Sequence, residues 1–204
     1  MATKTRASKT PAKPARKPLL KSRNKGAGKA PSAKKPAGKA SASRPAPVPG
    51  TEPQQRSLAN VKGFFERTLS VLEEGDSGFA PKPEMFTVAQ HVAHVAQTMD
   101  WFLEGAFRPE GFNMDFAGME QQVRGTTSLA QAKAWLNRAC TRLEAALKER
   151  PAAEWMQPIA KDTIMGGAPR CSIVDGIADH TAHHRGALAV YARLCGKTPA
   201  MPYM

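Results

Sequence analysis

All five histidines of the chain fall in two short clusters, His91 and His94 in one and His180, His183 and His184 in the other. Both clusters lie in stretches whose apolar spacing predicts helices, and residues three or four apart share one face of a helix. Neutral imidazole is the commonest protein ligand for transition metals. Two helices that aim such faces at each other would hold one metal ion between them.

The second cluster contains the pair with the more specific spacing. His180 and His184 are four residues apart, so their side chains lie about one turn from each other on one face. Helical metalloenzymes use this spacing to supply two ligands from one helix, although no Glu follows His180 and the metalloprotease motif is absent. His183 points about 100° away, toward solvent or the edge of a site. Hydrogen-bonded core histidines are the alternative, since a buried imidazole needs a partner.

Four helices are predicted to position these residues. Apolar periodicity marks residues 57–72, a helix from an N-cap at Thr87 to 105 or 107, one from an N-cap at Ser128 to about 148, and one from Ser172 to a C-terminal Gly196. The connection 108–126 has room for one helical turn, and 151–171 fits a hairpin or an extended crossover. The predicted fold class is all-α, a four-helix bundle with long connections that need not run simply up-down-up-down.

A basic tail precedes this near-neutral body. Residues 1–50 carry fourteen Lys or Arg and no Asp or Glu, whereas the remainder carries sixteen basic and seventeen acidic residues. Because the tail has too little apolar surface to offset chain entropy, we predict disorder over 1–55 and a bundle domain over 56–204. The Lys-Pro-Ala texture resembles the tails of linker histones and some bacterial nucleoid proteins, and it suits phosphate contacts that ignore sequence. A solvated arm without a specific partner is the alternative.

Cysteine usage and hydropathy indicate the compartment. The three cysteines are odd in number and form no C-x-x-C pair, and Cys140 and Cys195 fall at apolar-periodic positions. Buried thiols in a reducing cytoplasm are therefore expected. No run of about 18 apolar residues could span a bilayer, and no apolar segment suits secretion. A cytoplasmic protein without a membrane role is expected, with nucleoid association through the tail as a further expectation.

Two segments resemble a known family. The stretch "DHTAHHRGALAVYARLCGKTP" is similar to the last helix of the DinB-like, damage-inducible bacterial proteins, which has the form H-x-x-x-H-R-G-Q-L. The stretch "TVAQHVAHVAQTMDW" resembles their second helix, with His94 at the ligand position and His91 in place of an apolar residue. The resemblance covers residues 56–204 and implies a four-helix bundle, often a homodimer, with His94, His180 and His184 as metal ligands. One departure is Ala187, where the family usually has Gln.

The resemblance also implies a function. The family includes metal-dependent thiol transferases that use low-molecular-weight thiols, and hydrolases, so a metal-dependent enzyme acting on a small-molecule substrate is expected. A three-histidine site with an open position is catalytic rather than structural, and Zn²⁺, Ni²⁺ or Fe²⁺ would accept it. The metal could make hydroxide for hydrolysis or present a thiolate for transfer. The alternative is a DNA-associated stress protein whose tail binds nucleic acid and whose bundle is a dimeric, non-catalytic scaffold.

Several other polar and aromatic residues could contribute to the site. Asp100 and Asp179 lie near the histidines in sequence and could accept a ring N–H, although solvated surface charge is favoured for both. Arg185 could bind an anionic substrate, but a structural pair is favoured. Packing is favoured for the tryptophans, with Trp155 as a candidate cap over a pocket.

Overall fold

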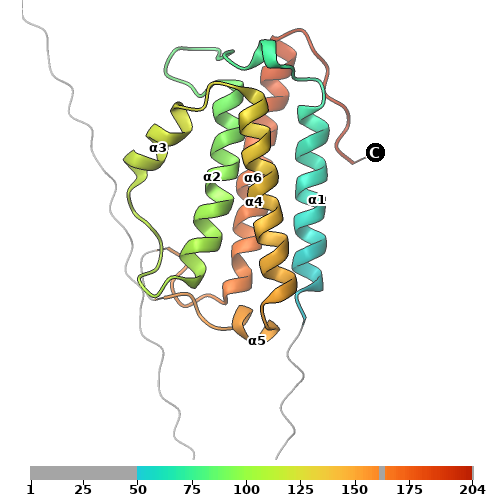
Figure 1. The fold of residues 1–204 in the computed structure, drawn as a ribbon. Coiled ribbons are helices and arrows are strands. Elements are labelled where there is room, and N and C mark those ends of the chain that lie inside the picture. The colour runs from blue at the N-terminus through green and yellow to red at the C-terminus, as the bar shows by residue number, and fades with distance from the viewer. Residues whose placement is uncertain (1–49, 161–163, 204) are drawn as a thin grey trace, which may run out of the picture. The chain divides into compact units, whose positions relative to one another are not determined.

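Four long helices lie side by side in the computed structural model, which describes residues 50–160 and 164–203 (Figure 1). They are α1 (Glu52–Leu69), α2 (Val88–Phe107), α4 (Leu129–Glu149) and α6 (Ile173–Leu194). The chain direction in Figure 1 shows α1 and α6 running one way and α2 and α4 the other. The described chain holds no strand, so the predicted all-α bundle is confirmed and its order is up-down-down-up. The predicted tail up to residue 49 lies outside the described residues.

The first helix begins earlier than its apolar stripe predicts. Helix α1 starts at Glu52 rather than Ser57, so residues assigned to the tail form its first turn. Pro53 suits that turn because its fixed φ is helical and its missing N–H would be unpaired there anyway. The Thr51 hydroxyl then donates to the Leu147 carbonyl at 2.6 Å, which ties this end of α1 to α4. At its other end α1 stops at Leu69, and Leu72 is buried from a turn instead.

The ends of the other helices follow local chemistry. Thr87 caps α2 through a capping box with Gln90, and the Ser128 hydroxyl accepts from the Gln131 amide at the start of α4. The last helix is expected to open at Ser172, and α6 begins one residue later, at Ile173; the 3-10 turn η2 (Arg170–Ser172) leads into it, and the Ser172 side chain makes no capping hydrogen bond. After α6, Gly196 adopts φ 75°, which closes a Schellman motif.

The two long connections are more structured than predicted. The segment after α2 holds α3 (Phe116–Arg124), a nine-residue helix capped by Asp115, which lies beside α2 on the flank of the bundle (Figure 1). The segment after α4 holds the short α5 (Ala152–Trp155) and one isolated antiparallel bridge between Pro158 and Pro169. The described part of this segment therefore has one isolated bridge and not the full hairpin that was one of its two predicted forms.

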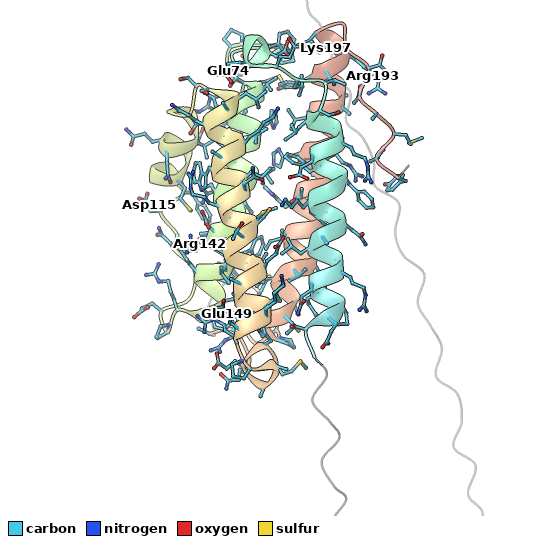
Figure 2. All side chains as sticks on the ribbon, turned by 45° about the vertical axis from the view of Figure 1, so that its right-hand side comes forward. Glu74, Asp115, Arg142, Glu149, Arg193 and Lys197 are labelled. Atoms are coloured by element: carbon cyan, nitrogen blue, oxygen red, sulfur yellow. The ribbon has the colours of Figure 1, made fainter. Side chains whose placement is uncertain are left out.

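An ion pair closes the end of the bundle where the first connection turns. Lys197, just after α6, lies 2.6 Å from Asp76 in the 3-10 turn η1 (Glu74–Asp76). Figure 2 shows Lys197 and Glu74 at this same end of the molecule. The pair ties the end of α6 to the turn that precedes α2, and fully buried side chains, Cys140 among them, form the core. No helix of the described chain is long and apolar enough to cross a membrane.

Candidate metal centre

Helices α2 and α6 bring four of the five histidines into one cluster. Ring nitrogens of His94, His180 and His184 all lie within 4.8 Å of one another. The Nε2 atoms of His94 and His180 are 3.2 Å apart. His184 is 7% exposed, and the other two are half-buried. The convergence expected from the sequence is therefore present.

The three nitrogens fit a transition-metal ion. Two nitrogens bound at 2.0–2.1 Å to one tetrahedral ion lie roughly 3.3 Å apart, close to the 3.2 Å between His94 and His180. The group consists of imidazoles alone, with no carboxylate. Three nitrogen donors suit Zn²⁺, Ni²⁺ or Fe²⁺ and disfavour Mg²⁺ or Ca²⁺, which prefer oxygen. The residues present could therefore hold one transition-metal ion.

Burial keeps these histidines in the neutral form that a metal requires. Loss of hydration lowers the pKa of His180 to about 4 and that of His184 to about 3, and the neighbouring imidazoles add to both shifts. Burial also lowers the pKa of His94, although the Glu120 carboxylate opposes the shift. At neutral pH each ring has one nitrogen with a free lone pair, as a ligand must.

His91 is the fourth member of the cluster, although the family resemblance gave it an apolar place. Its Nδ1 lies 3.0 Å from the Nδ1 of His184. Tyr191 and Phe86 surround the His91 ring edge-on, and the Tyr191 hydroxyl donates to the Phe86 carbonyl. The Nε2 of His91 is buried and has no hydrogen-bond partner among the described residues. His91 is therefore hydrogen-bonded through its Nδ1 to the Nδ1 of His184.

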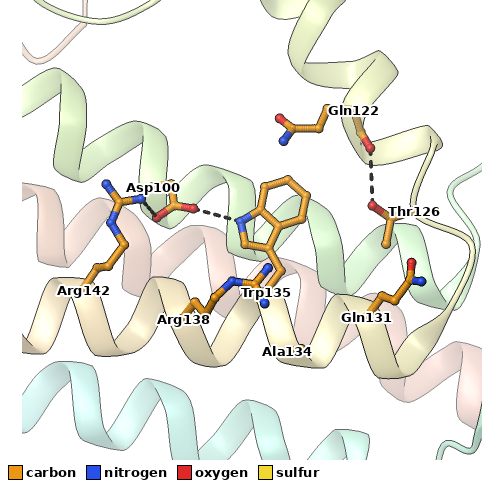
Figure 3. Close-up of a pocket in the computed structure, with 8 residues that line it drawn as sticks. All are labelled: Asp100, Gln122, Thr126, Gln131, Ala134, Trp135, Arg138 and Arg142. Carbon is orange, nitrogen blue, oxygen red and sulfur yellow. Dashed lines mark hydrogen bonds and ion pairs between the residues drawn. The ribbon is translucent and has the colours of Figure 1, made fainter.

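The acidic residues near the clusters do not support the histidines. Asp100 accepts from Trp135 Nε1 at 2.8 Å and pairs with Arg142 at 2.7 Å, beside a polar cavity of about 510 Å³ (Figure 3). Asp179 is exposed, and so is His183. The favoured surface role holds for Asp179, whereas Asp100 ties α2 to α4.

Arg185 and Trp155, two other candidates for the site, pack against neighbouring side chains. Arg185 pairs with no acidic residue of the described chain; its guanidinium donates to the Tyr203 hydroxyl and stacks over the Phe64 and Tyr203 rings. Trp155 is 1% exposed and packs edge-on against Phe107, so it does not cap a pocket. The acidic partner expected for Arg185 is therefore replaced by aromatic contacts, and the suggestion that Trp155 caps a pocket is wrong.

A second cavity, of about 440 Å³, opens beside the histidine cluster. Its walls come from α2, from α3, from α6 and from the residue just before the α2 cap. The lining residues are Phe86, His94, Gln97, Thr98, Trp101, Phe116, Met119, Glu120 and His180. Sequence reasoning missed this cavity because it treated 108–126 as a connection and Trp101 as packing. The available signal was the pair of large apolar residues, Phe116 and Met119, within that connection.

Comparison with known proteins identifies the family of the chain. The family model described as the DinB superfamily matches residues 59–188, well over half of the chain, so the chain belongs to the DinB superfamily. It is also similar to a crystal structure of a Streptococcus pneumoniae protein from the Northeast Structural Genomics Consortium. That match has a TM-score of 0.53 and 16% identity, and covers 72% of this chain and 93% of the other. Such a likeness concerns the fold. No curated protein matches the chain.

Proposed function

We propose that the chain is a metal-dependent enzyme whose metal is held by His94, His180 and His184, and which performs thiol transfer or hydrolysis. The observation that carries the proposal is the convergence of three neutral ring nitrogens within 4.8 Å beside an apolar cavity. When bound, the divalent ion supplies Lewis acidity that lowers the pKa of a thiol or a water molecule. The cavity supplies room for the second reactant.

His91 orients His184 in this proposal. A ligating histidine binds through one ring nitrogen and donates its other N–H to a partner. Because Nδ1 of His184 faces Nδ1 of His91 at 3.0 Å, His184 keeps Nε2 for the metal and donates from Nδ1. The proton of His91 then lies on its buried Nε2. His91 acts as a positioning residue, and Tyr191 and Phe86 hold its ring in place.

The cavity walls limit the water that reaches the reacting groups. Phe86, Trp101 and Phe116 present aromatic surface, and only a few polar atoms interrupt it. The cavity is polar at its histidine end and apolar elsewhere, which is the usual arrangement of a small-molecule site. The His94 and His180 rings belong to both the cluster and the lining, so a bound molecule contacts the proposed ligands directly.

Metal analysis of the untagged full-length protein tests the proposal. We expect about one transition-metal ion per chain, and loss of that ion in His94→Ala, His180→Ala and His184→Ala. His183→Ala is the matched control, because His183 lies on the same helix and is exposed; it should retain the ion. Absence of metal from the parent protein after growth and purification without chelators, and after incubation with Zn²⁺, Ni²⁺ or Fe²⁺, would refute the proposal.

Two substrates separate the two reactions. Naphthyl acetate reports hydrolysis, in which water adds to the acyl carbon and naphthol leaves with a proton. Chlorodinitrobenzene with cysteine reports thiol transfer, in which sulfur bonds to the ring carbon, chloride leaves and the thiol proton passes to solvent. If the parent protein is active in one of these two assays and His184→Ala is not, that assay identifies the reaction. A rate equal in parent and variant would show that the cluster takes no part.

The role of the basic tail is a separate proposal. Fourteen positive and no negative charges over residues 1–50 suit non-specific nucleic-acid binding and a nucleoid location. In this alternative the bundle is a dimeric scaffold. The two proposals are compatible, because a tail can localise an enzyme whose site lies in the bundle.

A further inference from the structure

Most polar side chains that line the cavity beside the histidine cluster already have partners within the protein. Trp101 donates its indole N–H to the Asn113 carbonyl at 2.7 Å, so it offers the cavity a ring without a free donor. Glu120 accepts from Arg124 at 2.8 Å, which compensates its charge. The Gln97 amide donates to the Met119 sulfur at 2.8 Å. Most polar groups of the wall are therefore already paired within the protein.

Few groups remain to bind a charged ligand. Among the described residues that line the cavity, none is a Lys or an Arg, and the one charged residue is Glu120. The Thr98 hydroxyl makes no hydrogen bond to any described residue, so it is available to a ligand. An anion placed here would lose hydration without a lining cation to pair with, because Arg124, which stacks over the lining Phe86 ring, is already engaged by Glu120. The wall therefore selects against negative charge.

The short helix α3 forms one wall of the cavity with two large apolar side chains. Phe116 is 53% exposed, and Met119 projects from the same helix one turn later. The Trp101 ring lies beside that of Phe116, with ring centroids 6.2 Å apart, and Phe86 also lines the cavity. The exposed part of such an aromatic wall loses its contact with water when a flat apolar ligand packs on it.

We propose that this cavity binds an uncharged aromatic or aliphatic small molecule, with its reactive polar group against His94 and His180. The inference rests on the proposed function for the reaction, but the cavity's preference stands on its own lining. An apolar cavity of about 150 Å³ accommodates benzene, so a cavity of about 440 Å³ accepts a molecule of up to roughly eighteen non-hydrogen atoms. Thr98 offers one hydrogen bond that can orient it.

A matched set of probes tests the preference for an uncharged ligand. Naphthylmethanol, naphthoate and naphthylmethylammonium have nearly the same shape and differ in charge. Binding to the full chain is followed by tryptophan fluorescence and calorimetry, both as purified and after EDTA treatment, because a metal ion would itself attract naphthoate. In the EDTA-treated protein we expect naphthylmethanol to bind at least about tenfold more tightly than naphthoate. Equal or tighter binding of naphthoate there would overturn the inference.

Two variants locate the binding to the α3 wall. Phe116→Ala should weaken naphthylmethanol binding about five- to tenfold, whereas Met114→Ala should not change it. Met114 is the control because it is also exposed, at 49%, and does not line the cavity. Glu120→Gln should reduce the difference in affinity between naphthylmethanol and naphthoate. Identical affinities in Phe116→Ala and Met114→Ala would place the probe elsewhere and refute the inference.

The outcomes also separate this inference from the proposed function. Protein that binds no metal but prefers naphthylmethanol through Phe116 would refute the metal-dependent enzyme and retain the apolar site. Protein that binds one metal through the three histidines but prefers naphthoate after EDTA treatment would retain the metal centre and refute the substrate class.

Discussion

Replacing His91 by Leu should flatten the dependence of stability on pH in the metal-free protein. His91 is 8% exposed, and burial lowers its pKa to about 4, with the charges of neighbouring histidines adding to the shift. In the unfolded chain its pKa returns to about 6.5. Between these two values the unfolded state holds a proton that the folded state does not. The contribution of His91 to stability is therefore lost as the pH falls from 6.5 toward 4.

The size of this contribution follows from the two pKa values. Each pH unit in the window costs up to about 1.4 kcal/mol for one proton. From pH 7 to pH 5, His91 alone should cost about 2 kcal/mol of the free energy of unfolding. His180 and His184 act in the same direction, because their pKa values are lowered to about 4 and about 3. The parent protein without metal should therefore be markedly acid-sensitive.

Urea unfolding of EDTA-treated protein at pH 7, 6 and 5 measures the effect. The loss of stability between pH 7 and 5 should be smaller in His91→Leu than in the parent by about 2 kcal/mol. Tyr191→Phe is the control, since it removes the hydrogen bond to the Phe86 carbonyl beside the same ring and keeps every histidine. It should lower stability at all three pH values and leave the slope unchanged. Equal slopes in His91→Leu and the parent would refute the reasoning.

Four further predictions concern the metal, the second helix, the tail and the oligomeric state. His91→Leu should weaken metal binding about 10- to 100-fold, and His91→Gln, whose amide oxygen can accept the same N–H, should restore part of it, measured by competition with a chelating dye. Thr87→Ala removes the cap of α2 and should cost about 1 kcal/mol in urea unfolding; an unchanged midpoint would contradict the capping role. Deleting residues 1–49 should abolish salt-sensitive DNA binding, and no binding by the full chain at low salt would end that hypothesis. The predicted homodimer should sediment at twice the chain mass.

Two histidine-bearing helix faces were readable from the sequence because helical periodicity is a local rule, whereas the choice of His94 over His91 as a ligand came from the family resemblance. Once His94 and the pair His180 and His184 fall on helices, their faces follow from 3.6 residues per turn. The position of His91 did not follow in the same way. Whether it faces an apolar layer or another ring depends on the rotation of α2 against α6, which no local pattern sets. Its contact with His184 therefore emerges only from the packed bundle.

Helix α3 was missed for a different reason. It spans nine residues, Phe116–Arg124, with a single buried member, Val123, so it lacks the repeated apolar stripe by which longer helices are recognised. Its N-cap Asp115 was present in the sequence but stood in a Gly-rich stretch. A short helix that packs on one neighbour gains its stability from that neighbour rather than from its own propensity.

The topology explains why the connection that lacked a clear pattern carries the cavity wall. Because α2 and α4 run in the same direction (Figure 1), the chain must return along the bundle between Phe107 and Leu129 before α4 can begin. That return places α3 beside α2, and His94 lies on α2. The three proposed ligands belong to long helices fixed by the core, whereas Phe116 and Met119 belong to the return segment. Changes in α3 can therefore alter which small molecule fits while the histidine cluster keeps its geometry.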